Sequence, residues 1–135
     1  MKLSIVATLY QSAPYLNEFY ERARNAAYEL VEEDFEIILV NDGSPDDSLE
    51  LAIELTKADQ HVVVVDLSRN FGHHKAMMTG LAHAKGAYIF LIDSDLEEEP
   101  EWLLNFATQM DQERCDVIYG AQERRKGNWF ERWSG

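Results

Sequence analysis

The stretch Ile37-Ile38-Leu39-Val40 is apolar at four consecutive positions, and Val62-Val63-Val64-Val65 repeats this pattern further along the chain. Successive side chains of a β-strand point to opposite faces of its sheet, so both runs are apolar on both faces. Strands of this kind belong to parallel sheets that helices cover on both sides. The two runs therefore predict an α/β domain.

Strand and helix signals alternate outward from these two runs. Strands are expected at 3–9, 35–40, 62–67, 88–92 and 117–119, and helices at 14–32, 44–58, 73–84 and 100–110. Ser44 is expected to be the N-cap of the second helix, because Pro45 and an acidic residue follow it. This order predicts a mostly parallel sheet with right-handed crossovers, in which ligands bind at the carboxyl ends of the strands.

Composition limits the kinds of partner. The 135 residues fit one domain and carry a net charge of −13, from 25 acidic and 12 basic residues. Such a charge disfavours nucleic acid as a partner, because phosphate backbones are bound by Lys and Arg. An acidic pocket would also repel a diphosphate unless a divalent cation lay between them.

The remaining composition signals concern location and the end of the chain. The apolar run 87–92 is too short to span a bilayer, and the N-terminus lacks the pattern of a signal peptide. Cys115 is the single cysteine, so an intrachain disulfide is excluded, and inert packing is the favoured role for it. The basic residues Arg124, Arg125, Lys126 and Arg132 form either a solvated tail or a segment that meets phosphate or a membrane surface.

Polar residues follow each of the first four expected strands. The carboxyl ends of parallel strands lie at one edge of a sheet, so these residues are expected to meet there. They are Thr8, Tyr10, Gln11 and Ser12, then Asn41-Asp42-Gly43-Ser44, then Ser68-Arg69-Asn70-Phe71-Gly72, and finally Asp93-Ser94-Asp95.

The pair Asp93 and Asp95 is the sharpest chemical signal in this set. Residues i and i+2 of an extended segment point the same way, and two carboxylates on one side favour a bound cation. Oxygen ligands suit Mg²⁺ or Mn²⁺, and Mg²⁺ is often held by one or two carboxylates together with substrate phosphates.

Several neighbouring residues leave two interpretations open. The acids Glu97, Glu98, Glu99 and Glu101 suit the N-terminus of the helix at Pro100, although Glu97 is near enough to reach the site. Asp42 either caps the following helix or accepts a hydrogen bond from a base or ribose. His73, His74 and Lys75 form either a solvated helix turn or a phosphate contact, and zinc spacing is absent. Walker A, G-x-G-x-x-G and G-x-S-x-G motifs are also absent from the sequence.

Six segments in this order resemble glycosyltransferase family 2, which has the GT-A fold. More narrowly, they resemble its branch of polyprenyl-phosphate (dolichyl-phosphate) mannosyl- and glucosyltransferases. The segments are S-I-V-A-T-L-Y (4–10), I-L-V-N-D-G-S-P-D (38–46), L-S-R-N-F-G-H-H-K-A (67–76), G-L-A-H-A-K-G (80–86), I-D-S-D-L-E-E-E-P (92–100) and D-V-I-Y-G (116–120).

The resemblance implies a role for each matching position. Thr8 and Tyr10 would line the base and ribose pocket, and Asp42 would bond the base. Asp93 would contact ribose or sugar, and Asp95 would hold the divalent metal on the diphosphate, which makes these two acids the catalytic candidates. Two cations would lie beside the nucleotide, namely Arg69 and Lys75.

The resemblance also implies a reaction and a setting. A sugar would pass from a UDP- or GDP-linked donor to a polyprenyl phosphate with inversion, in the synthesis of cell wall or other polysaccharide. Residues 1–135 would be the N-terminal, donor-binding part of a domain that is incomplete at its C-terminus and lacks the acceptor-binding part. The protein would be cytoplasmic and would reach the inner face of the membrane through that absent part.

Three departures and two alternatives stay open beside this resemblance. Thr8 stands where Pro is commoner in the family, and Glu97 stands where Gln is common. Gln122 stands where the branch often has Arg, so the phosphate contact of that Arg would have to come from Arg124 or Arg125. A nucleotide-sugar-binding module without catalysis, or a truncated remnant, is the alternative to an active transferase. A receiver-like interaction domain is disfavoured, because receivers place paired acids after the first strand.

Overall fold

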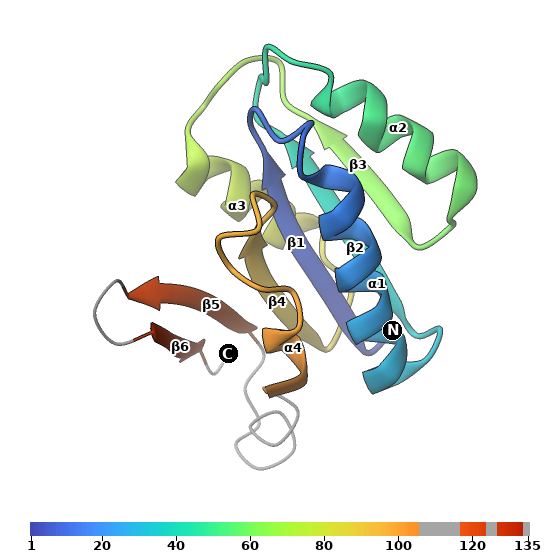
Figure 1. Ribbon diagram of the computed structural model, residues 1–135, viewed down its shortest axis with the longest axis vertical. Helices are drawn as coiled ribbons and strands as arrows, with labels where there is room; N and C mark the ends of the chain where they lie inside the picture. Colours follow the sequence, from blue (N-terminus) through green and yellow to red (C-terminus); the bar gives the residue numbers. More distant parts are fainter. Residues whose placement is uncertain (106–116, 124–126, 134–135) are drawn as a thin grey trace.

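The computed structural model describes residues 1–105, 117–123 and 127–133, and its strands form one sheet (Figure 1). The sheet has six strands in the order β3-β2-β1-β4-β5-β6. Adjacent strands are parallel except for the antiparallel pair β5 and β6. The strands are β1 (Leu3–Leu9), β2 (Phe35–Asn41), β3 (Val62–Asp66), β4 (Tyr88–Asp93), β5 (Val117–Glu123) and β6 (Gly127–Trp133).

Helices cover both faces of this sheet, as its apolar strands require. The helices are α1 (Leu16–Val31), α2 (Ser48–Ala58), α3 (His73–His83) and the short α4 (Trp102–Asn105). Phe19 of α1, Ala52 of α2 and Trp102 of α4 pack on one face, against alternate residues of the central strands. Ala76 of α3 packs on the other face against Val6, within the second hydrophobic cluster. The expected α/β fold, a mostly parallel sheet with helices on both faces, is confirmed.

The start of α2 differs from the expectation. The helix begins at Ser48 rather than after Ser44, and its N-cap is Asp47. The Ser44 hydroxyl instead bonds the Asp46 carboxylate at 2.5 Å and accepts a hydrogen bond from the Gln11 backbone N–H at 2.8 Å. Ser44 therefore joins two loops, and the prediction that it caps the helix is wrong.

The last two strands also extend beyond the expectation. The fifth strand continues to Glu123, so that Gln122 lies within it. The segment from Gly127 to Trp133 pairs antiparallel with it, although the sequence showed no completed unit there. The helix expected to reach Met110 is described as far as Asn105. The expectations for Cys115, Arg124, Arg125 and Lys126 lie outside the described residues.

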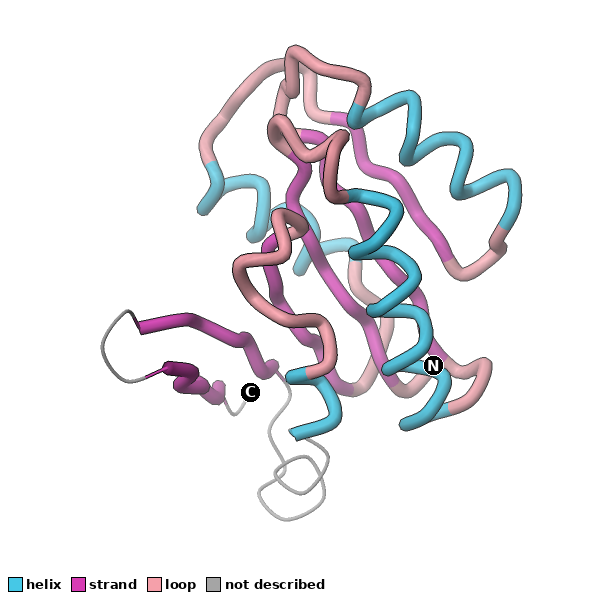
Figure 2. Tube along the Cα trace, in the orientation of Figure 1, coloured by secondary structure: helices cyan, strands magenta, loops and turns pink. Residues whose placement is uncertain are grey.

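The loops that follow the first four strands gather at one end of the sheet (Figure 2). Strand pairing shows why, because Leu9 pairs with Asn41, Asn41 with Asp66, and Thr8 with Asp93. Each of these four strands therefore ends at nearly the same level. Among the described residues, none of the helices is long and apolar enough to cross a membrane.

Candidate functional site

The candidate site lies where β1 separates β2 from β4. Chain order reverses at this point, because β2 and β3 extend to one side of β1 and β4 to the other. Open parallel sheets bind ligands in the crevice outside the carboxyl ends of their strands at such a switch point. The expectation that the four polar strand ends share one edge is confirmed by the strand register.

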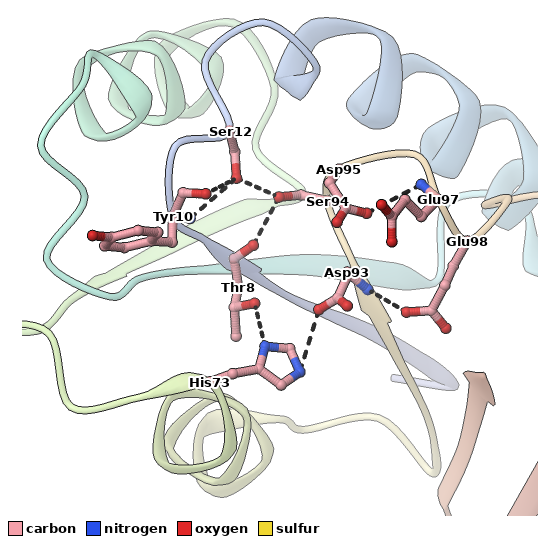
Figure 3. Close-up of polar contacts among 9 residues, drawn as sticks. All are labelled: Thr8, Tyr10, Ser12, His73, Asp93, Ser94, Asp95, Glu97 and Glu98. Carbon is pink, nitrogen blue, oxygen red and sulfur yellow. Dashed lines mark hydrogen bonds and ion pairs between the residues drawn. The ribbon is translucent and has the colours of Figure 1, made fainter. Parts of the chain in front are cut away.

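Ser94, the middle residue of the acidic motif, joins the ends of β4 and β1 through hydrogen bonds (Figure 3). Its side chain is buried, its hydroxyl donates to the Thr8 carbonyl at 2.7 Å, and it lies 2.8 Å from the Ser12 hydroxyl. The Ser12 hydroxyl in turn accepts a hydrogen bond from the Tyr10 backbone N–H. The motif is thus anchored by its serine, which leaves the two flanking acids for other contacts.

Asp93 faces His73, the first residue of α3 (Figure 3). Its carboxylate Oδ1 lies 3.3 Å from His73 Nε2, and the other ring nitrogen, Nδ1, lies 3.2 Å from the Thr8 hydroxyl. Burial and the charge of Asp95 raise the pKa of Asp93, whereas the neighbouring His73 lowers it. Thr8, His73 and Asp93 therefore form one chain of contacts between β1, α3 and β4.

Asp95 lies outside the strand, because β4 ends at Asp93. Its carboxylate accepts a hydrogen bond from the Glu97 backbone N–H at 3.1 Å within a tight turn, and Leu96 of this turn has a left-handed φ of 66°. The two aspartates thus face different partners, Asp93 toward His73 and Asp95 toward the turn (Figure 3). The rule for an extended backbone does not apply to Asp95, because the strand ends at Asp93, and the charges of the two carboxylates influence each other.

Glu98 is a third acid of the site. Its Oε1 accepts a hydrogen bond from the Asp93 backbone N–H at 3.3 Å, while Oε2 is buried and has no hydrogen-bond partner. Burial and the nearby charge of Asp93 raise the pKa of Glu98 to about 8. The sequence assigned this residue to the helix N-terminus, and only its place beneath the strand end reveals its contact with the site.

The loops after β2 and β3 lie at the same carboxyl edge of the sheet, on the other side of β1 from β4. Asp42 is buried, and its carboxylate accepts a hydrogen bond from the Phe71 backbone N–H at 2.8 Å. The Asn70 side chain donates to the Asp42 carbonyl at 3.1 Å. Gly43 lies so close that a Cβ there would be 2.4 Å from the Asn70 backbone nitrogen. Asp42 therefore joins the two loops and does not cap α2, whose N-cap is Asp47, while its expected contact to a base stays a prediction.

The remaining expected residues are exposed at the same edge. The Tyr10 side chain is 49% exposed, and the Arg69 guanidinium lies 4.7 Å from the centre of the Phe71 ring. Lys75 is exposed in the first turn of α3. Within the described part of the chain, neither Arg69 nor Lys75 forms an ion pair, so both positive charges are available to a phosphate group.

The donor atoms of the edge suit a hard divalent cation. The described residues contain no group of three or more His, Cys, Asp and Glu side chains placed to hold a metal ion by themselves. Asp95 offers a carboxylate next to two further acids, one of which has a buried oxygen without a partner. A single carboxylate combined with substrate phosphates is a common arrangement for Mg²⁺. The residues therefore fit a metal that arrives with a diphosphate.

The structure gives contacts to three residues whose roles the sequence left open. Ser94 was expected only as part of a polar strand end, His73 as either a solvated helix residue or a phosphate contact, and Glu98 as an acid at the helix N-terminus. A signal for Ser94 was present, since a small hydroxyl residue between two acids can turn inward. The contacts of His73 join residues far apart in the chain, and the contact of Glu98 with the Asp93 backbone depends on how the acidic loop folds, so no local pattern indicated them.

Comparison with known proteins identifies related sequences. Residues 4–135 match the sequence model of the family described as Glycosyl transferase family 2. A protein of Mycobacterium tuberculosis (strain CDC 1551 / Oshkosh), named among the glycosyltransferases, is 55% identical over 130 residues, which are 96% of this chain and 38% of that protein. YkcC of Bacillus subtilis (strain 168), named as a glycosyltransferase, is 35% identical over 96% of this chain and 40% of its own length. The chain thus spans about two-fifths of these curated relatives.

Solved structures share the fold. TarS 1–349 of S. aureus in complex with UDP-GlcNAc has a TM-score of 0.70 and 25% identity, covering 94% of this chain and 36% of that one. The mannosyltransferase PcManGT of Pyrobaculum calidifontis, in complex with GDP-Man and Mn²⁺, has a TM-score of 0.60 at 20% identity. That likeness covers 70% of this chain and 27% of the mannosyltransferase, and it concerns the fold alone.

Proposed function

Because the chain belongs to glycosyltransferase family 2, we propose that its carboxyl edge binds a nucleotide-diphosphate sugar, the donor of a glycosyl transfer. One observation carries this proposal. Polar side chains from β1, β2, β3 and β4 meet in register at the switch point of the sheet, where open α/β sheets bind their ligands. The nucleotide sugar bound by TarS, which shares this fold, supports the same class of ligand.

Each wall of the edge has a part in this proposal. Thr8 of β1 and Tyr10, which follows this strand, line the base and ribose pocket, and Asp42 orders the loop on the other side and bonds the base. Arg69 and Lys75 supply positive charge for the diphosphate. Asp93 accepts hydrogen bonds from hydroxyl groups of the ribose or the sugar.

Asp95 would hold a Mg²⁺ or Mn²⁺ ion together with the diphosphate oxygens. Such an ion is a Lewis acid that stabilises the nucleotide diphosphate as it leaves the sugar. The neighbouring acids make it more necessary, because Asp93, Asp95 and Glu98 would otherwise repel the diphosphate. The exposed turn at Asp95 gives the diphosphate access to this carboxylate.

The acceptor is proposed to be a polyprenyl phosphate at the inner face of a membrane. Its phosphate oxygen is already anionic, so it attacks the anomeric carbon without needing a base. The bond from that carbon to the diphosphate breaks on the opposite side, and the anomeric configuration inverts. The acceptor would be bound by a part of the protein other than these 135 residues, as the greater length of the relatives allows.

Calorimetry on this chain tests the donor site. We expect UDP-GlcNAc or GDP-mannose to bind in the presence of Mn²⁺ and to bind poorly with EDTA. Asp95→Asn should weaken this binding about tenfold or more, as loss of a metal contact does. Glu99→Gln is the matched control, because it removes the same charge from an exposed position of the same loop. Absence of binding by the wild type would refute the donor site, and equal binding by Asp95→Asn would refute its metal role.

A further inference from the structure

The ring of His73 bridges two neighbouring strands across the switch point (Figure 3). Thr8 and Asp93 are direct partners in the register of β1 and β4. His73 comes from α3, yet its Nδ1 lies 3.2 Å from the Thr8 hydroxyl and its Nε2 lies 3.3 Å from the Asp93 carboxylate. Both ring nitrogens are thus engaged with residues assigned above to the donor site.

These contacts place a proton on one nitrogen of the ring. An ionised carboxylate only accepts hydrogen bonds, so the Nε2 atom of His73 must carry the proton that faces Asp93. In a neutral ring, Nδ1 then accepts the hydroxyl proton of Thr8, and in a doubly protonated ring Nδ1–H donates to the Thr8 oxygen. Both forms keep Nε2–H directed at Asp93.

The position of His73 is set by the helix that carries it. His73 is the first residue of α3 and follows Gly72, whose φ of 103° strongly favours glycine. The helix lies close on the sheet at Gly80, where a Cβ would be 2.4 Å from Val6 Cγ1. The close packing at Gly80 sets the distance of α3 from the sheet, and the half-exposed His73 ring extends from the first turn of this helix to the sheet edge.

The contact from α3 also sets the direction of the Asp93 carboxylate. His73 Nε2 lies 3.3 Å from Asp93 Oδ1, so a hydrogen-bond donor on the α3 side fixes the rotation of this carboxylate. The contact thereby decides which oxygen faces the carboxyl edge of the sheet.

We propose that His73 is a positioning residue of the donor site, which orients the Asp93 carboxylate toward a hydroxyl group of the donor through Nε2–H. This inference rests on the proposed function, since it assumes that Asp93 meets the donor. His73 acts through Asp93 and does not itself touch the reacting atoms.

Three substitutions of His73 distinguish orientation of the Asp93 carboxylate from a contact that only attaches α3 to the sheet. His73→Gln keeps an amide N–H near the place of Nε2, whereas His73→Asn keeps a polar group only near Nδ1 and Thr8. We expect His73→Ala and His73→Asn to weaken binding of UDP-GlcNAc with Mn²⁺ about tenfold, the usual scale for a hydrogen bond to a charged group. His73→Gln should stay within about threefold of the wild type on the same scale. His83→Ala, at the exposed last turn of the same helix, should bind as the wild type does.

A spectroscopic readout completes the test. Long-range ¹H–¹⁵N spectra of the histidine rings should show a proton on Nε2 of His73 in the free protein, and circular dichroism should show that each variant folds. Rescue by Asn instead of Gln, wild-type binding by His73→Ala, or an Nδ1–H tautomer would each overturn the inference. Failure of the wild type to bind any nucleotide sugar would instead overturn the proposed function, and the inference with it.

Discussion

Glu98 is a carboxylic acid whose surroundings favour its protonated form. Burial and the charge of Asp93 raise its pKa from 4.5 to about 8. A group whose folded pKa lies above its unfolded pKa binds more protons in the folded state between these values. Its contribution to stability is therefore fully present below about pH 4.5 and is lost as the pH rises through 8.

Replacement of Glu98 by Gln should remove this pH dependence. Gln keeps an oxygen that can accept the Asp93 backbone N–H but cannot ionise. We expect Glu98→Gln and the wild type to unfold at similar temperatures near pH 4, and the variant to become the more stable one as the pH rises to 9. Thermal unfolding in EDTA measures this, and a stability gap that stays constant or shrinks with rising pH would contradict it.

Gly43 shows how closely the loops after β2 and β3 approach. Its φ is 63°, and a Cβ at this position would lie 2.4 Å from the Asn70 backbone nitrogen. We expect Gly43→Ala to combine backbone strain with a clash against backbone, and to lower the free energy of unfolding by more than about 2 kcal/mol. Denaturant unfolding measures this loss.

Gly72→Ala is the control for that substitution. Gly72 also has a positive φ, of 103°, but no atom lies within 4 Å of the place of its Cβ. It therefore shows the cost of backbone strain without a clash. If Gly43→Ala cost no more than about 1 kcal/mol, the scale of one left-handed residue without a clash, the close approach of the two loops would be refuted.

At the scale of elements, α3 is the one described helix that contributes residues to the second hydrophobic cluster, on its face of the sheet. A Cβ at Gly80 would lie 2.4 Å from Val6 Cγ1 and 2.9 Å from Val40 Cγ2. Alanine favours helices over glycine by about 1 kcal/mol, but overpacking of a core costs about 1–3 kcal/mol. The clash should therefore exceed the gain.

We expect Gly80→Ala to lower the free energy of unfolding and to weaken donor binding, because α3 must move outward and carries His73 with it. Met78→Ala is the control, since its side chain is 44% exposed on the same helix. Denaturant unfolding and calorimetry measure the two effects. A Gly80→Ala variant more stable than the wild type would show that α3 lies farther from the sheet than described.

Most helices and strands could be predicted from the sequence, but several of their boundaries could not. Apolar runs and helical spacing identified the four helices and the first five strands, because burial imposes those patterns locally. The start of α2 was misplaced because Ser44 bonds to Gln11, 33 residues away. The sixth strand was missed because its pairing with the fifth leaves no local apolar period, although its aromatic residues are typical of strands.

The candidate site was predictable to a similar extent. Strand ends identified Thr8, Asp42 and Asp93, since parallel strands necessarily place such residues at one edge. The directions of the acidic side chains were not predictable, because Asp95 lies in a turn with a left-handed residue after it. The contacts of His73 and Glu98 depend on how α3 and the acidic loop pack, which no local pattern records.

At the scale of the whole molecule, sheet order places the switch point beside the central strand β1. The net charge of −13 makes this edge a poor site for a bare diphosphate, which is why the account requires a divalent cation at Asp95. The central claim is therefore that the donor and the cation bind together at the carboxyl edge between β1 and β4.

Paramagnetic broadening by Mn²⁺ tests this claim most directly. In backbone NMR spectra recorded with UDP-GlcNAc or GDP-mannose, substoichiometric Mn²⁺ should broaden the amide signals of Thr8, His73, Asp93 and Asp95. The signals of Lys2 and Asp34, at the opposite end of the sheet, should stay sharp. Broadening centred away from the carboxyl edge, or spread evenly over the acidic surface, would contradict the account.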